Sequence, residues 1–219
     1  MNKNKNKQLR QLGRFIVIDG LDAVGKTTLT RKLAQTLGAE ELKCPPQIVA
    51  PSLLNGDLRK HFDKQPPTQR RAYYRFANLI AGEQARIAVA SGKDVVIDRY
   101  WTSTVAFSAL DPSSITSDNI DSEYPPEMLK PDIVILLTVD ETRRTERLRG
   151  RGEPVTEEEY KLAHEEAGRK ALLQAYRQFK PVEVDTSKLD PQGVLNAVLE
   201  ILATIIPLDD DTSDLNEDQ

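Results

Sequence analysis

The first stretch that could do chemistry is GLDAVGKTT at 20–28, directly after an apolar run at 15–18. Its glycines and its Lys-Thr pair have the spacing of a phosphate-binding loop, where backbone N–H groups and a helix N-terminus surround phosphate oxygens. Lys26 would reach the terminal phosphates, and the hydroxyl of Thr27 would ligate magnesium. We therefore expect this loop to hold a nucleoside triphosphate, through Gly20, Asp22, Ala23, Val24, Gly25, Lys26, Thr27 and Thr28.

A second candidate segment is DRYWTSTVAF at 98–107, which follows the apolar run DVVI. Asp98 can hold magnesium through water, and the planar guanidinium of Arg99 can bind two phosphates at once. Ligands of parallel sheets bind beyond the carboxyl ends of the strands, so we expect both side chains to face the phosphate loop. The alternative is a plain ion pair between Asp98 and Arg99 at the end of a strand.

The elements that must position these residues alternate between strands and helices. Short apolar runs predict strands, and apolar residues at helical spacing predict helices. The predicted strands are 15–18, 94–97, 132–137 and 182–184, and the predicted helices are 27–37, 68–90, 142–148, 156–179 and one that begins at Pro191. Asp140 is a suitable N-cap for the third helix. This alternation predicts an α/β fold with a parallel sheet covered on both faces.

Length and composition indicate one such domain with polar ends. A chain of 219 residues is long enough for one well-buried α/β domain and short for two. We expect a basic tail at 1–13, a domain at 14–207 and an acidic tail at 208–219, with a polar surface insertion at 111–127. The net charge is −4, and the basic end has no aromatic residues, so we expect no nucleic-acid partner.

Cysteine content and hydropathy bear on the compartment. Cys44 is the single cysteine, which excludes an intrachain disulfide and makes a reducing compartment the default. No apolar run approaches the roughly 18 residues of a membrane span, so we expect no membrane association. The first 14 residues lack the apolar core of a secretory signal. They are basic and free of acids, as transit segments are, yet short and rich in Asn. We expect a cytoplasmic protein, with mitochondria as the alternative.

Other classes of nucleotide-binding protein fit less well. A GTPase would carry a DxxG motif and a base-reading NKxD motif after later strands, and neither stands in place. A motor or an AAA-type ATPase would need a longer chain. The phosphate loop therefore favours a phosphotransferase.

Three stretches together resemble the thymidylate kinase family: GLDAVGKTT, DRYWTSTVAF and LKPDIVILLTVDETRRTERLRGRG. The resemblance spans about residues 14–206 and is closest to the family's mitochondrial UMP/CMP kinase branch. It implies a P-loop kinase fold with a five-stranded parallel sheet and a short lid at about 149–157. It also implies ATP as phosphoryl donor, Mg²⁺, and usually a homodimer.

The resemblance also implies where further cations lie. Some family members carry an arginine in the phosphate loop, where this chain has Ala23 and Val24. The role then shifts to the lid, where we favour Arg149 and Arg151 and expect Arg147 to face the helix surface. A solvated charge run is the alternative. Lys43 matches the position of a phosphate-binding arginine but lacks the bidentate fork.

The same resemblance assigns the substrate contacts. Asp22 would meet the 3′-hydroxyl of the acceptor sugar, unless it only caps its own turn. Tyr74 would stack on the base, and Asn78 stands where thymidylate kinases carry an arginine that donates to thymine. An amide can donate or accept, so it suits uracil and cytosine. The resemblance assigns further substrate contacts to Arg99, Tyr100, Ser103 and Phe107, and a contact beside the donor adenine to Asp185.

The sequence therefore predicts ATP-dependent phosphorylation of CMP, dCMP, UMP or dUMP, with dTMP as the alternative acceptor. The aromatic residues near Tyr74 could instead belong to the core. Two other classes stay open. A deoxynucleoside kinase needs a carboxylate base near the sugar, and no Glu-Arg-Ser-type motif follows the 94–97 strand. A non-catalytic nucleotide-binding regulator is opposed by Lys26, Thr27, Asp98 and Arg99, which are all present.

Overall fold

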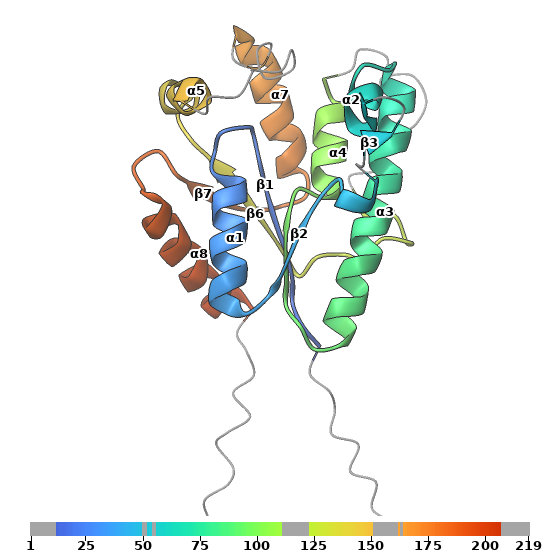
Figure 1. The fold of residues 1–219 in the computed structure, drawn as a ribbon. Coiled ribbons are helices and arrows are strands. Elements are labelled where there is room, and N and C mark those ends of the chain that lie inside the picture. The colour runs from blue at the N-terminus through green and yellow to red at the C-terminus, as the bar shows by residue number, and fades with distance from the viewer. Residues whose placement is uncertain are drawn as a thin grey trace, which may run out of the picture.

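A five-stranded parallel sheet forms the centre of the computed structural model, which describes residues 12–49, 52–53, 56–110, 123–150, 162 and 164–206 (Figure 1). Its strands are β1 (Phe15–Gly20), β2 (Glu40–Lys43), β5 (Val95–Asp98), β6 (Ile133–Thr138) and β7 (Val182–Asp185). The helices are α1 (Lys26–Leu37), α2 (Leu58–Asp63), α3 (Pro67–Ala90), α4 (Trp101–Ser108), α5 (Glu141–Gly150), α7 (Glu166–Arg177) and α8 (Pro191–Ile205). A 3₁₀ turn η1 (Gln47–Val49) and a hairpin of β3 (Ser52–Leu53) and β4 (Gly56–Asp57) complete the described elements.

The strands follow the order β2-β5-β1-β6-β7, and every neighbouring pair is parallel. Side chains of β1 alternate between the two faces of the sheet, as the period of a strand requires. Ile16 and Ile18 belong to the core with α1, α7 and α8, whereas Phe15 and Val17 belong to the core with α3 and α4. The predicted α/β fold, with helices on both faces, is confirmed (Figure 1).

Strand register brings together the phosphate loop at 20–28 and the segment at 98–107. Ile18 of β1 pairs with Asp98 of β5, and Asp98 also pairs with Lys43 of β2. The loop after β1 and the residues after β5 therefore leave the sheet at the same carboxyl edge. Helices α2, α5 and α7 lie beyond that edge, at the end of the molecule opposite the described termini (Figure 1).

The four strands predicted from apolar runs are present, and each lies within two residues of its expected position. Four elements were not predicted as such: β2, α2, α4 and the β3–β4 hairpin. Asp140 accepts from the backbone N–H of Arg143 at 2.8 Å, as an N-cap does. Predictions for 1–11 of the basic tail, for the whole acidic tail, for 111–122 of the insertion, for 151–157 of the lid and for 156–161 of the 156–179 helix lie outside the described residues. In the described parts of the chain, no helix is both long and apolar enough to span a membrane.

Candidate active site

The phosphate loop connects β1 to α1 through residues 21–25. Gly20 has φ 139°, and a Cβ there would lie 2.5 Å from the carbonyl oxygen of Leu137, so only glycine fits. Gly25, the N-cap of α1, has φ 106°, and Ala23 also has a positive φ of 66°. The loop thus turns back onto the N-terminus of a helix, which is the arrangement that binds phosphate.

Lys26 is held inside this loop rather than in solvent. Its Nζ donates to the carbonyl oxygen of Leu21 at 2.6 Å and lies 3.7 Å from Asp22 Oδ1. Burial, with the repulsion of Arg99, lowers the pKa of Lys26 to about 8, although Asp22 opposes the shift. A phosphate group bound at the loop would place negative charge beside Lys26 and so stabilise the protonated amine.

Asp98 and Thr27 form a pair suited to magnesium. The Thr27 hydroxyl donates to Asp98 Oδ2 at 2.6 Å, while Asp98 Oδ1 is buried with no hydrogen-bond partner among the described residues. An orphaned carboxylate oxygen is costly to bury and fits a water molecule of a hydrated cation. No group of three or more His, Cys, Asp or Glu within the described residues could hold a metal ion by itself. The residues therefore fit a magnesium ion that keeps waters and nucleotide phosphates as its other ligands.

Arg99 follows β5 with a left-handed φ of 70°, which turns its side chain toward the phosphate loop. Its Nη2 donates to Asp22 Oδ1 at 2.5 Å, and its Nη1 donates to Ser103 Oγ at 3.0 Å. The guanidinium also lies over the ring of Phe107, with 5.2 Å between Cζ and the centroid. The structure thus brings together three residues predicted from the motifs: Asp22, Lys26 and Arg99.

A buried polar network lies behind Arg99. Asp19 is fully buried and accepts hydrogen bonds from the hydroxyls of Thr102 and Ser103. Burial raises the pKa of Asp19, and Arg99 acts against that shift. The phenol of Tyr176 joins the network at 2.8 Å from Ser103 Oγ. Asp19 and Tyr176 were not predicted, because the first looks like a strand residue and no motif surrounds the second.

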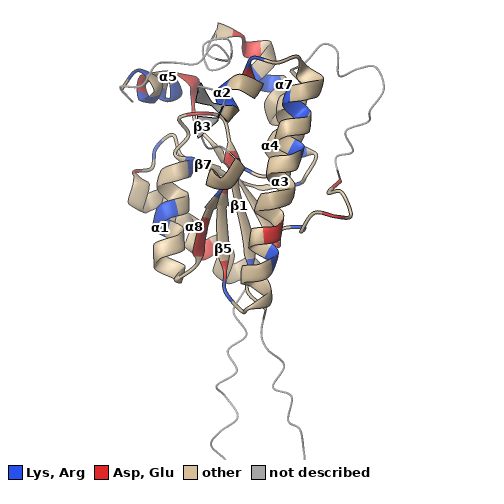
Figure 2. Ribbon diagram, turned by 45° about the vertical axis from the view of Figure 1, so that its right-hand side comes forward, with Lys and Arg blue, Asp and Glu red and all other residues tan. Residues whose placement is uncertain are grey.

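Helix α5 is rich in arginine, and its ribbon is largely coloured for basic and acidic residues (Figure 2). Arg147 donates to Val24 O at 3.3 Å, to Thr186 Oγ1 at 3.1 Å and to Thr186 O at 3.1 Å. The prediction that Arg147 faces the helix surface is therefore wrong, since it joins the phosphate loop to the loop after β7. Arg144, fully buried, forms a bidentate pair with Glu141 at 2.8 Å.

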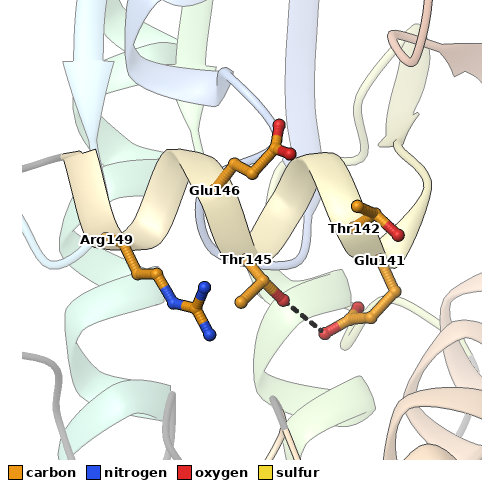
Figure 3. Close-up of a pocket in the computed structure, with 5 residues that line it drawn as sticks. All are labelled: Glu141, Thr142, Thr145, Glu146 and Arg149. Atoms are coloured by element: carbon orange, nitrogen blue, oxygen red, sulfur yellow. Dashed lines mark hydrogen bonds between the residues drawn. The ribbon is translucent and has the colours of Figure 1, made fainter.

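Arg149, in the last turn of α5, is exposed. It lines a cavity of about 330 Å³ with Glu141, Thr142, Thr145 and Glu146 (Figure 3). In that view Arg149 points to the same side of α5 as Thr145 and Glu141, which hydrogen-bond to each other at 3.4 Å. Within the described residues no hydrogen bond or ion pair joins Arg149 to the phosphate loop, so its predicted role stays a prediction. Arg151 lies outside the described residues.

The residues predicted to contact the base lie between α3 and α4. Asn78 is fully buried, and its Nδ2 donates to Tyr74 O at 2.8 Å and to Thr104 Oγ1 at 2.7 Å. Its Oδ1 accepts from the Cys44 thiol at 3.4 Å. The Tyr74 ring is half-buried, and its hydroxyl donates to Asp63 at 2.7 Å. The amide of Asn78 therefore serves contacts within the protein.

The remaining predicted contacts differ in exposure. Tyr100 is buried in the core with α3, edge-to-face against Phe15, whereas Phe107 is only partly buried. Lys43 is exposed at the end of β2, level with Asp98. Thr28 and Asp185 are also exposed, and the carboxylate of Asp185 accepts from the backbone N–H of Ser187 at 2.9 Å.

Comparison with known proteins agrees with this geometry. The model of a family described as thymidylate kinase matches residues 18–192. The human protein "UMP-CMP kinase 2, mitochondrial" is 34% identical over 205 residues, which cover 88% of this chain and 43% of that protein. The chain thus spans less than half the length of this relative.

Solved structures share the fold. The thymidylate kinase of Candida albicans superposes with a TM-score of 0.66 at 19% identity, covering 88% of this chain and 92% of that one. The deoxyadenosine kinase of M. mycoides gives a TM-score of 0.58 at 20% identity, covering 87% of this chain and all of that one. At such identities the likeness shows the fold alone and does not separate the two activities.

Proposed function

The chain belongs to the thymidylate kinase family, and we propose that it transfers the γ-phosphoryl group of ATP to a pyrimidine nucleoside monophosphate. The proposed acceptors are CMP, dCMP, UMP and dUMP, and the products are ADP and the nucleoside diphosphate. The name of the human relative, "UMP-CMP kinase 2, mitochondrial", supports this acceptor class. The absence of an arginine at position 78, where thymidylate kinases read thymine, is in keeping with it.

The observation that carries this proposal is the pair of cations that meet at Asp22. Arg99 Nη2 lies 2.5 Å and Lys26 Nζ 3.7 Å from the same carboxylate oxygen. An acceptor phosphate is already ionised, so transfer needs alignment of two anions and neutralisation of charge rather than a general base. Two cations on one side of a phosphate loop are suited to this task.

Each of these side chains then has a distinct task. Lys26 binds the donor phosphates, and the guanidinium of Arg99 binds the acceptor phosphate through paired donors. Asp22, released from Arg99, accepts a hydrogen bond from the 3′-hydroxyl of the acceptor sugar. This exchange of partners leaves the carboxylate of Asp22 hydrogen-bonded before and after binding.

Magnesium would be held by the Thr27 hydroxyl and, through water, by the free Oδ1 of Asp98. When bound, the ion supplies positive charge to the donor phosphates. Arg147 holds the loop after β7 against the phosphate loop. The donor adenine would bind beside Asp185 at the end of β7. Arg149 and Arg151 complete the set of cations from the lid.

Release of ADP from ATP tests this proposal, with CMP, dCMP, UMP, dUMP, dTMP, cytidine and thymidine as acceptors. We expect turnover with the cytosine and uracil monophosphates and none with the nucleosides. Lys26→Met and Arg99→Lys should each lower kcat by about 100-fold or more, because each removes charge or geometry at the transferred group. Thr204→Ala, which removes an exposed hydroxyl on α8, is the control.

Other outcomes would separate the alternatives. Turnover with dTMP alone would make the protein a thymidylate kinase, which the family description favours. Turnover with nucleosides alone would make it a deoxynucleoside kinase. No turnover with any acceptor, despite binding of ATP, would indicate a regulator. Full activity of Arg99→Lys would contradict the proposal that the paired cations Lys26 and Arg99 support phosphoryl transfer.

Assembly and compartment are part of the same proposal. We expect a homodimer, in keeping with the family, and light scattering during gel filtration would measure its mass. A cytoplasmic location is expected from the sequence, whereas the name of the human relative points to mitochondria. Fractionation of cells that express the full chain decides between the two.

A further inference from the structure

Tyr176 is a buried residue that the proposed chemistry does not use. It lies on α7, and only 1% of it is exposed. Its hydroxyl lies 2.8 Å from Ser103 Oγ and accepts from Arg99 Nη1 at 3.3 Å. Helix α7 packs against α4, which carries Ser103, so elements far apart in the chain meet at this point.

The hydrogen atoms of the network fix its direction. Ser103 has one hydroxyl proton, which it donates to the buried carboxylate of Asp19. Its oxygen must therefore accept from both Tyr176 and Arg99. The phenol donates to Ser103 and accepts from the guanidinium. The hydrogen bonds thus run from Arg99 through two hydroxyls to Asp19.

With the hydrogen bonds arranged in this way, one nitrogen of Arg99, Nη1, is fixed by the protein. Nη1 is held by the two hydroxyls, while Nη2 donates to Asp22. If Asp22 turns to a sugar hydroxyl, the contacts at Nη1 are the hydrogen bonds that still hold the guanidinium within the described residues. An arginine side chain loses much rotamer freedom when it is fixed, so an anchored one binds an anion at lower entropic cost.

We propose that Tyr176 and Ser103 are positioning residues, which hold Nη1 of Arg99 so that its other edge faces the acceptor phosphate. This inference rests on the proposed function, because it takes Arg99 as the group that binds the acceptor. Neither hydroxyl needs to touch the substrate. Asp19 anchors the end of the network, which explains a buried carboxylate that has two hydroxyl donors and, among the described residues, no ion pair.

Tyr176→Phe tests the inference, because it removes one oxygen and keeps the ring in place. We expect kcat/KM for the acceptor to fall about tenfold, which is about 1.4 kcal/mol, while KM for ATP changes by less than about twofold. Thr204→Ala is the control for removal of a hydroxyl, since the exposed Thr204 on α8 donates to the backbone carbonyl of Glu200 in the same helix. It should leave both constants unchanged.

The decisive measurement repeats the change in an Arg99→Lys background. A residue that acts through the guanidinium should then cost nothing further, whereas a merely structural role would still lower activity and melting temperature. Ser103→Ala should reproduce the loss and should not add to Tyr176→Phe. It also serves if Tyr176→Phe fails to fold.

Two results would overturn the inference. The first is an active wild-type protein with Tyr176→Phe equal to it, which leaves the proposed function standing. The second is the same tenfold loss in the Arg99→Lys background as in the wild type. A wild-type protein that phosphorylates none of the monophosphates would instead overturn the proposed function, and this inference with it.

Discussion

The substitution Asn78→Ala separates two possible roles of Asn78: contact with the nucleotide base, which the sequence predicts, and stabilisation of the fold. In the structure the amide makes three hydrogen bonds, to Tyr74 O, Thr104 Oγ1 and the Cys44 thiol. None of the side chain is exposed. If these contacts persist when substrate binds, Asn78 holds α3 against α4 and against the residue that follows β2. Its loss should then affect stability before base preference.

The magnitude follows from those contacts. A neutral hydrogen bond contributes about 1 kcal/mol net, and the thiol bond contributes less. Together with a small cavity, the loss should lower the free energy of unfolding by about 2–3 kcal/mol. For a chain of this length that is a fall of about 5–10 °C in melting temperature. The ratio of kcat/KM for CMP to that for dTMP should change by less than about twofold.

Urea unfolding and steady-state kinetics with both acceptors measure the two quantities. Asn196→Ala is the matched control, because Asn196 is an exposed helical asparagine that accepts one hydrogen bond from Gln192. It should change the free energy of unfolding by less than about 0.5 kcal/mol. If Asn78→Ala left stability unchanged and shifted the acceptor ratio about tenfold, the structural role would be refuted.

Three further results are expected. Binding of ADP should weaken as the pH rises through about 8, because Lys26 loses its charge there; calorimetry should show the fall, and Lys26→Arg should lack it. Gly20→Ala should lower the free energy of unfolding by about 3 kcal/mol or more in urea, whereas Gly150→Ala, with nothing within 4 Å of its Cβ, should not. Asp98→Asn keeps an oxygen that can accept the hydrogen bond from the Thr27 hydroxyl, but it removes the negative charge. It should therefore raise the magnesium concentration needed for half-maximal activity about 10–100-fold.

Sequence patterns predicted four of the five strands of the parallel sheet and missed β2, which lies at one edge. β1, β5 and β6 are continuous apolar runs, as strands covered on both faces must be. β2 reads Glu-Glu-Leu-Lys and has partly buried and exposed positions in alternation, since it lies at the edge of the sheet. Its pairing with β5 holds it there, and no local pattern shows that pairing.

Motif spacing located the loops of the site but not the direction of side chains on helices. Asp22, Lys26 and Arg99 lie on short loops or helix starts whose backbone is fixed by the motif itself. Arg147 and Arg149 stand two apart on α5, so they point to different sides of the helix, and the sequence does not say which side meets the phosphate loop. Tyr176 takes part only because α7 packs on α4, a contact between distant segments.

The site without substrate has its cations already paired, and this has a consequence for selectivity. Arg99 cannot bind a phosphate fully while Asp22 holds its Nη2 at 2.5 Å. A bare phosphate would displace a partly buried carboxylate and leave it without that partner, which is costly. A nucleoside monophosphate brings its own compensation, because its sugar hydroxyl can donate to the carboxylate that its phosphate displaces. Under the proposed function, the ion pair between Arg99 and Asp22 therefore links recognition of the sugar to recognition of the phosphate and favours nucleotides over free phosphate.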